Sequence, residues 1–199
     1  MNTDKKLQIK LVIFTVIRGK LKIFLPEKVL PSTAIVKEKP LDKIARSLFE
    51  ATVCIPFKDY YFEQLYTFSQ HKEVAIVYYL LLPHYLIPQK SIKAWYDGQK
   101  LSKTLTDFST IKYAIQRLQW KIEYTNIVYS FLPKTFVFSQ LQTVYEAILG
   151  KGLDKRNFRK KMLSLNILKP TGRMKRLGPS RPAEMFSFKM RRLTYVEIL

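Results

Sequence analysis

The chain has 199 residues, of which 47% are hydrophobic, so it can bury one large core or two smaller ones, and a disordered protein is excluded. Its 35 Lys and Arg residues outnumber 15 Asp and Glu residues and give a formal net charge of +20, which favours a polyanionic partner such as nucleic acid. Cys54 is the single cysteine, which excludes an intramolecular disulfide and a cysteine-rich zinc site and indicates the reducing cytoplasm.

Two apolar runs predict β-strands rather than membrane segments. The run over 7–17 stops at Arg18 and lacks a small-residue cleavage site, so it differs from a signal peptide. The run over 74–82 is about half as long as a bilayer-spanning helix. We therefore expect two strands and no membrane anchor.

Two other stretches repeat apolar residues at helical spacing. Residues 40–52 do so with Leu41, Ile44, Ala45, Leu48 and Thr52. Residues 108–124 form a longer amphipathic pattern, preceded by Asp107 as a candidate N-cap, and its core-facing stripe comprises Ile111, Ile115, Leu118 and Ile122. The mixture of strands and helices predicts an α+β fold.

Charge is distributed unevenly along the chain. From Gly150 to Arg192 there are 14 Lys and Arg residues and two acids, whereas the first 149 residues hold 21 basic and 12 acidic residues. Pro133 interrupts the pattern between the two parts. We expect one domain over 1–131, which ends with the helix 108–124 as a linker, and a strongly basic domain over 132–199.

The basic part begins with two predicted helices. Ser139 and Gln142 have the spacing of a capping box for a helix over 138–150, whose buried stripe comprises Leu141, Val144, Tyr145, Ile148 and Leu149. Gly150 is a suitable C-terminal stop, and Asp154 is a suitable N-cap for a second helix after a short turn. The core-facing side of that helix comprises Phe158, Met162 and Leu165. Its other side, or the border, carries the basic residues Lys155, Arg156, Arg159 and Lys160.

A basic hairpin is predicted after the second helix. Two apolar segments, 167–168 and 185–188, flank a loop that carries Arg173, Lys175, Arg176 and Arg181. A helix pair followed by a basic hairpin is typical of a winged helix-turn-helix domain, whose second helix enters the major groove of double-stranded DNA. RNA is less expected, because no aromatic stacking platform or glycine-loop signature is present. The alternative is a basic surface that is merely solvated.

The segment 30–55, LPSTAIVKEKPLDKIARSLFEATVCI, places Glu38, Arg46, Leu48 and Glu50 at a spacing that resembles the Nudix hydrolase signature. That signature runs Gly, five residues, Glu, seven residues, then Arg-Glu-aliphatic-x-Glu-Glu-x-Gly-aliphatic. The segment departs from it at Ser32, Ser47, Ala51, Val53 and Cys54. The following YFEQLYTFSQ, 61–70, resembles the strand after the signature helix in one subgroup. The resemblance implies an α/β/α sandwich.

The departures remove catalytic carboxylates. In the family, glutamates at i, i+3 and i+4 on one helix face hold Mg²⁺ against a pyrophosphate, and here Ser47 and Ala51 replace two of them while Glu50 remains. We therefore expect no catalytic residue, no metal and no enzyme activity, with Glu50 solvated and Arg46 paired with Glu38. No transferable motif marks a nucleotide site, so the effector-binding residues are unknown.

Three further stretches resemble the NrtR-type regulators, which are Nudix-related transcriptional regulators of NAD metabolism: YAIQRLQWKIEYTNIVYSFLP (113–133), FVFSQLQTVYEAILGKGLDKRNFRKKML (136–163) and RPAEMFSF (181–188). The resemblance implies a homodimer in which an inactive Nudix-like domain senses ADP-ribose or a related NAD metabolite and a winged helix binds a DNA operator. It implies no cofactor. Two alternatives remain open: a residual nucleotide pyrophosphatase acting on ADP-ribose or NADH, and a regulator that has lost its nucleotide effector and responds to a protein partner.

Overall fold

The computed structural model describes residues 5–70, 72–176 and 181–198, and the chain divides into two compact units. The first unit comprises residues up to 15 together with 22–114, and the second comprises 16–21 together with 115–199. β1 (Lys6–Ile17) and α2 (Phe108–Tyr124) each run from one unit into the other. The functional division predicted from the sequence, 1–131 and 132–199, remains our proposal.

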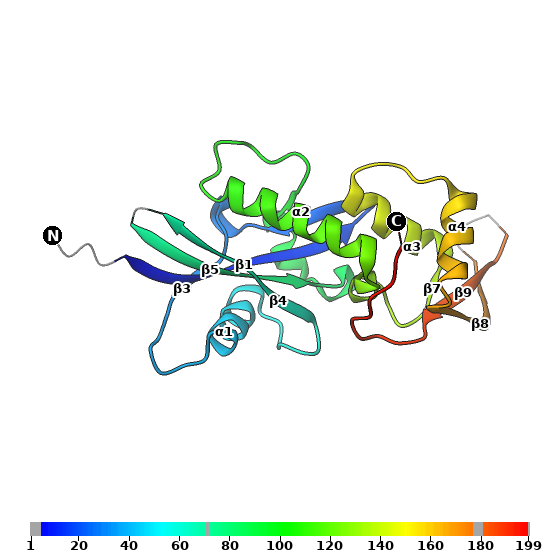
Figure 1. Ribbon diagram of the computed structural model, residues 1–199, viewed down its shortest axis with the longest axis horizontal. Helices are drawn as coiled ribbons and strands as arrows, with labels where there is room; N and C mark the ends of the chain where they lie inside the picture. Colours follow the sequence, from blue (N-terminus) through cyan, green and yellow to red (C-terminus); the bar gives the residue numbers. More distant parts are fainter. Residues whose placement is uncertain (1–4, 71, 177–180, 199) are drawn as a thin grey trace. The chain divides into compact units, whose positions relative to one another are not determined.

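The first unit is built on a six-stranded mixed sheet (Figure 1). β1 and β5 are parallel, with Leu7 opposite Val74, whereas the pairs β4–β5, β1–β3 and β2–β6 are antiparallel. β3 (Ser32–Ala34) pairs with β1 outside the main path. The main path follows the order β4 (Tyr61–Gln70), β5 (Glu73–Leu81), β1, β2 (Lys20–Phe24) and β6 (Trp95–Asp97). The strands predicted over 7–17, 61–70 and 74–82 are confirmed.

β1 is the central strand of this sheet because its residues are apolar almost without interruption. Every residue from Leu11 to Val16 is buried, which requires cover on both faces of the sheet. α1 (Leu41–Val53) lies on one face and the first turns of α2 lie on the other (Figure 1). The predicted α/β/α sandwich is confirmed.

Short 3-10 helices occupy several connections: η1 (Pro26–Lys28), η2 (His84–Leu86), η3 (Gln89–Ala94) and η4 (Ile127–Ser130). Within the described ranges, none of the helices has both the length and the apolar character needed to cross a membrane.

The second unit contains a helix pair, α3 (Phe138–Leu149) and α4 (Lys155–Ser164), and a small antiparallel sheet. Phe158 of α4 packs against Tyr145 of α3, with ring centroids 5.1 Å apart. The sheet has the order β7 (Phe136–Val137), β9 (Ala183–Phe188) and β8 (Leu168–Lys175). A helix pair followed by a hairpin is the winged helix topology, so the predicted helices and hairpin are confirmed.

The chain after β9 returns to the end of α2. Asn126 is 2% exposed; its side chain accepts the Thr194 N–H at 2.8 Å and donates to the Arg192 carbonyl at 3.1 Å. Ile198 is 1% exposed. The segment 190–198 is therefore an integral part of the second unit.

Candidate nucleic-acid interface

The turn between α3 and α4 is fixed by hydrogen bonds. Gly150 ends α3 with a φ of 71°, a left-handed conformation that glycine adopts without strain, and its N–H donates to the Glu146 carbonyl at 2.8 Å. Glu146 Oε1 accepts the Leu153 N–H at 3.0 Å, and Asp154 Oδ1 accepts the Asn157 N–H at 2.8 Å. The predicted stop at Gly150 and the N-cap at Asp154 are confirmed.

The start of α3 differs from the prediction. Val137 is the N-cap residue, and Gln140 Oε1 accepts its N–H at 3.0 Å. Ser139 lies inside the first turn, and Gln142 donates to the Leu153 carbonyl at 2.9 Å. The predicted Ser139–Gln142 capping box is wrong, because β7 leads directly into the helix and Gln142 is used to hold the turn after it.

α4 buries one side and exposes a basic one. Phe158 is 6% exposed and Met162 is fully buried. The basic residues predicted on this helix are all exposed, namely Lys155, Arg156, Arg159 and Lys160. Lys161 is a further exposed base on the helix that the helical spacing did not select.

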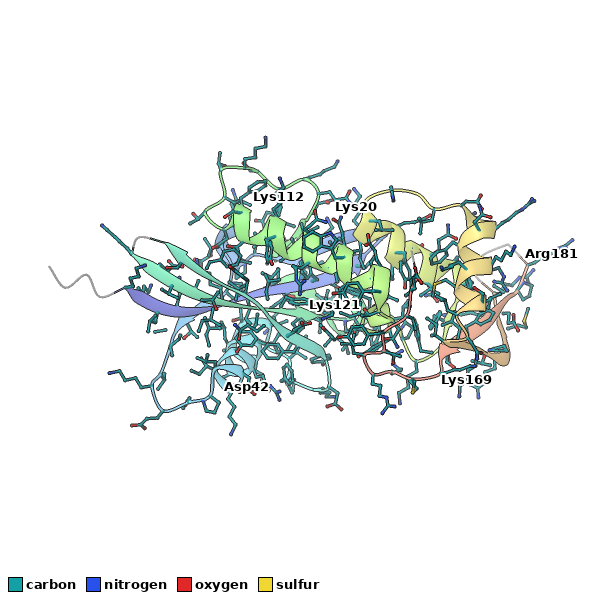
Figure 2. The ribbon with its side chains drawn as sticks, in the orientation of Figure 1. Lys20, Asp42, Lys112, Lys121, Lys169 and Arg181 are labelled. Carbon is teal, nitrogen blue, oxygen red and sulfur yellow. The ribbon has the colours of Figure 1, made fainter. Side chains whose placement is uncertain are left out.

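The β8–β9 hairpin forms the predicted wing, but β8 extends further than predicted, so Arg173 and Lys175 lie on this strand and not in the loop. Leu168 lies opposite Phe188 at its base, and Gly172, with a φ of 69°, lies where the register of β8 shifts. Figure 2 shows Arg181 extending outward at the end of the hairpin. The basic residues predicted on the wing are all exposed, namely Arg173, Lys175, Arg176 and Arg181.

Arg159 is held by neighbouring side chains. Its Cζ lies 4.8 Å from the centroid of the Phe138 ring and 5.4 Å from that of Phe186. Its Nη2 lies 3.9 Å from Glu184 Oε2 on β9, and the arginine side chain is still 45% exposed. Arg159 is therefore both oriented and accessible.

In the first unit, α1 carries the degenerate Nudix segment. Ser47, Glu50 and Ala51 are exposed at i, i+3 and i+4 on this helix. Glu50 Oε1 accepts the Phe57 N–H at 2.7 Å and so holds the loop after the helix. A hydroxyl, a methyl group and one hydrogen-bonded carboxylate do not supply the oxygen ligands that octahedral Mg²⁺ requires. The residues present therefore do not fit a Nudix metal centre.

Arg46 has a different partner from the one predicted. Its Nη2 lies 3.6 Å from Asp42 Oδ2, and its Cζ lies 4.7 Å from the centroid of the Phe57 ring. Glu38 lies in the exposed turn before α1, whereas Asp42 is one helical turn before Arg46. The predicted pair with Glu38 is therefore wrong. Glu50 is exposed as predicted, but it accepts a hydrogen bond rather than being only solvated.

A partly buried charged cluster in the first unit was not predicted. Lys10 Nζ lies 2.9 Å from Glu73 Oε1 and 3.0 Å from Asp107 Oδ1. Asp107 Oδ2 accepts the Leu30 N–H at 2.9 Å. Asp107 directly precedes α2 as predicted, but its carboxylate binds Lys10 and Leu30. The lysine in the apolar run of β1 was the sequence signal for this cluster.

The cluster shifts the pKa values of Lys10 and Glu73. Burial alone would lower the pKa of Lys10, but its hydrogen bonds to Glu73 and Asp107 outweigh burial and raise it. Burial alone would raise the pKa of Glu73, but hydrogen bonds from Lys10 and Gln8 outweigh burial and lower it. Both shifts favour the charged pair.

Comparison with known proteins gives matches for both parts of the chain. Residues 128–188 match the family described as the NrtR DNA-binding winged helix domain. The ADPR responsive transcriptional repressor NtrR of Acinetobacter baylyi is 27% identical over 92% of this chain and 81% of its own length. The crystal structure of Shewanella oneidensis NrtR complexed with a 27mer DNA superposes with a TM-score of 0.75 at 22% identity, covering 92% of this chain and 93% of that one. A MutT/nudix family protein from Enterococcus faecalis superposes with a TM-score of 0.64 at 16% identity, covering 94% of this chain and 89% of that one.

The fold and these matches define a protein with a Nudix-like domain followed by a winged helix domain. More particularly, residues 128–188 match the NrtR DNA-binding winged helix family, and the fold of the chain is similar to that of Shewanella oneidensis NrtR over most of its length.

Proposed function

We propose that this protein is a DNA-binding transcriptional regulator whose Nudix-like domain senses ADP-ribose or a related NAD metabolite without hydrolysing it. The observation that carries the proposal is the winged helix of the NrtR type, whose α4 and wing expose the predicted basic residues. Phosphate contacts supply most of the affinity of such domains, and contacts with base edges supply the specificity.

The basic residues divide into two proposed groups. Those of α4 enter the major groove: Lys155, Arg156, Arg159 and Lys160. Those of the wing bind phosphates or the minor groove: Arg173, Lys175, Arg176 and Arg181. Palindromic operators match two-fold symmetric proteins, so we propose a homodimer as the DNA-binding form.

The sensor role is supported by the chemistry of α1. Ser47 and Ala51 leave Glu50 as the carboxylate at the former metal-binding positions, and Glu50 holds a backbone N–H. A domain that cannot assemble the metal centre can bind a nucleotide and leave it intact, as a receptor must. The A. baylyi relative is named as responsive to ADPR, which makes ADP-ribose the first ligand to test.

The test of the regulator is DNA binding by the full-length protein. Duplexes are selected from a randomised pool, and their affinity is compared with that of random DNA by fluorescence anisotropy near physiological salt. A regulator recovers a common sequence motif and binds it at least about 1,000-fold more tightly than random DNA. Recovery of no common motif would refute the proposal.

A residual pyrophosphatase is the second candidate, because Glu38, Arg46 and Glu50 keep their signature positions. Incubation with ADP-ribose or NADH and Mg²⁺ separates the two functions. We expect both nucleotides to remain intact. Cleavage of more nucleotide molecules than there are protein molecules would identify an enzyme.

A further inference from the structure

The basic part of the winged helix domain contains two acidic residues between positions 150 and 192, Asp154 and Glu184. Asp154 caps α4 by accepting the Asn157 N–H. Glu184 instead lies on the wing strand β9, with Oε2 3.9 Å from Nη2 of Arg159 on the helix proposed to enter the major groove.

The guanidinium of Arg159 lies over two aromatic rings. Phe138 begins α3 and is 8% exposed, and Phe186 on β9 is 3% exposed. Their rings lie 5.8 Å apart, and the Arg159 Cζ lies within 5.4 Å of both. Three elements of the domain therefore determine where this side chain points.

Folding stability does not account for Glu184. The side chains of Arg159 and Glu184 are 45% and 43% exposed, and ion pairs this exposed contribute little to stability. A carboxylate on a surface that binds DNA also repels phosphates, which weakens association with every DNA sequence. Its contribution must lie in something other than general affinity.

We infer that Glu184 is a positioning residue that orients Arg159 to read a base in the major groove. A guanidinium donates two parallel hydrogen bonds to O6 and N7 of guanine, and this geometry requires the planar group to be held in one orientation. Glu184 Oε2 lies 3.9 Å from Nη2, beyond hydrogen-bond distance, so it attracts the guanidinium by charge without using a donor that the base needs. The inference rests on the proposed function and assigns the specificity of the domain to this pair.

The experiment compares Glu184→Gln with the wild-type full-length protein on the selected duplex and on random DNA. Removing the acidic charge strengthens binding to random DNA by about twofold, because one repulsive charge is lost. Binding to the selected duplex weakens, because Arg159 loses the carboxylate that orients it and keeps only its contacts with the two rings. The ratio of the two affinities therefore falls by about tenfold, within the range that one base contact contributes.

Asp154→Asn is the matched control. It removes one negative charge from the same domain and keeps a residue that caps helices as well as aspartate does. It strengthens binding to both DNAs and leaves their affinity ratio unchanged. Arg159→Ala lowers the affinity ratio by at least as much as Glu184→Gln does. The affinity ratio of the double variant is no lower than that of Arg159→Ala alone, because the two residues act as one unit.

Base replacement locates the contact. Each guanine of the selected duplex is replaced by 7-deazaguanine, which lacks the N7 acceptor. One replacement weakens binding of the wild-type protein by about tenfold and leaves binding of Arg159→Ala unchanged.

Two results would overturn the inference. One is a Glu184→Gln variant whose affinity ratio matches that of Asp154→Asn. The other is a Glu184→Gln variant that has a lowered melting temperature and binds both DNAs more weakly by the same factor, as a purely structural contact would. Failure of the wild-type protein to select any sequence refutes the proposed function itself, and the inference falls with it.

Discussion

Lys10 is the central residue of the charged cluster in the first unit. Its ammonium group forms ion pairs with Glu73 and Asp107, whose side chains are 31% and 8% exposed. Removal of the lysine leaves the more buried carboxylate with the Leu30 N–H as its neighbour and no counter-charge. Breaking a buried pair by deleting one partner costs more than the pair itself contributes.

We predict that Lys10→Met lowers the free energy of unfolding by roughly 2 to 3 kcal/mol, measured by urea denaturation. Lys22→Met is the control, because the Lys22–Asp97 ion pair is longer, at 3.8 Å. This substitution should lower the free energy of unfolding by less than about 1 kcal/mol. Equal losses in the two variants would contradict a special role for Lys10.

The same cluster sets a pH dependence. The raised pKa of Lys10 means that its contribution is fully present below the unfolded value of 10.5 and is lost as pH rises through the folded value. The lowered pKa of Glu73 means that its contribution is present above the unfolded value of 4.5 and is lost as pH falls through the folded value. We predict that the stability difference between wild type and Lys10→Met is constant from about pH 5 to 10 and shrinks outside that window. A difference that changes most near neutral pH would refute this.

Single residues were predictable from the sequence where the signal is local. Gly150 and Asp154 end and begin helices through bonds to residues within four positions, so their roles follow from neighbouring residues alone. Lys10 and Asp107 are 97 positions apart, and their contact depends on how β1 and the start of α2 meet in the fold. Glu184 and Arg159 likewise become partners only once the wing has folded beside α4.

At the scale of elements, the wing and the C-terminal segment 190–198 differ in what their residues contact. The wing carries exposed charge, whereas the segment 190–198 returns to the end of α2 and is held by Asn126. That segment lies beyond the residues that match the winged helix family, 128–188. The position of the segment could not be predicted from the sequence, since its hydrogen bonds with Asn126 join positions more than sixty residues apart.

We predict that Asn126→Ala destabilises the second unit by about 2 kcal/mol, because the buried side chain makes several hydrogen bonds to the backbone. Thermal unfolding measures the loss. Asn157→Ala, at an exposed position of α4, is the control and should change stability by less than about 0.5 kcal/mol. A loss no larger than that of the control would mean that the segment is dispensable.

The wing predicts a salt effect. Arg173→Ala should weaken binding to selected and random DNA by similar factors and reduce the slope of log affinity against log salt by about one unit. Lys43→Ala, on the exposed side of α1, removes the same charge from the first unit and should leave the slope unchanged. A loss confined to the selected duplex would assign Arg173 to base reading instead.

At the scale of the whole molecule, the fold class followed from the sequence because hydrophobic periodicity and the Nudix-like spacing agree with it. The long apolar run of β1 predicted a strand, and the basic helix pair with its hairpin predicted the winged helix. The effector contacts did not follow from the sequence, because no motif marks a nucleotide site in it.

The excess of positive charge is concentrated where the fold places the winged helix, and the altered signature lies on α1 of the other unit. The proposed regulator therefore joins a DNA-reading domain to a domain that holds a nucleotide without cleaving it. Coupling between them requires that ADP-ribose bind the DNA-competent and DNA-incompetent states with different affinity.

The most direct test is the affinity of the full-length protein for its selected duplex, measured by fluorescence anisotropy near physiological salt with and without saturating ADP-ribose. We predict that ADP-ribose changes this affinity by at least about fivefold, the lower range of coupling between two sites, and leaves the nucleotide uncleaved. Specific DNA binding that is identical with and without ADP-ribose would contradict the assignment of the Nudix-like domain as its sensor.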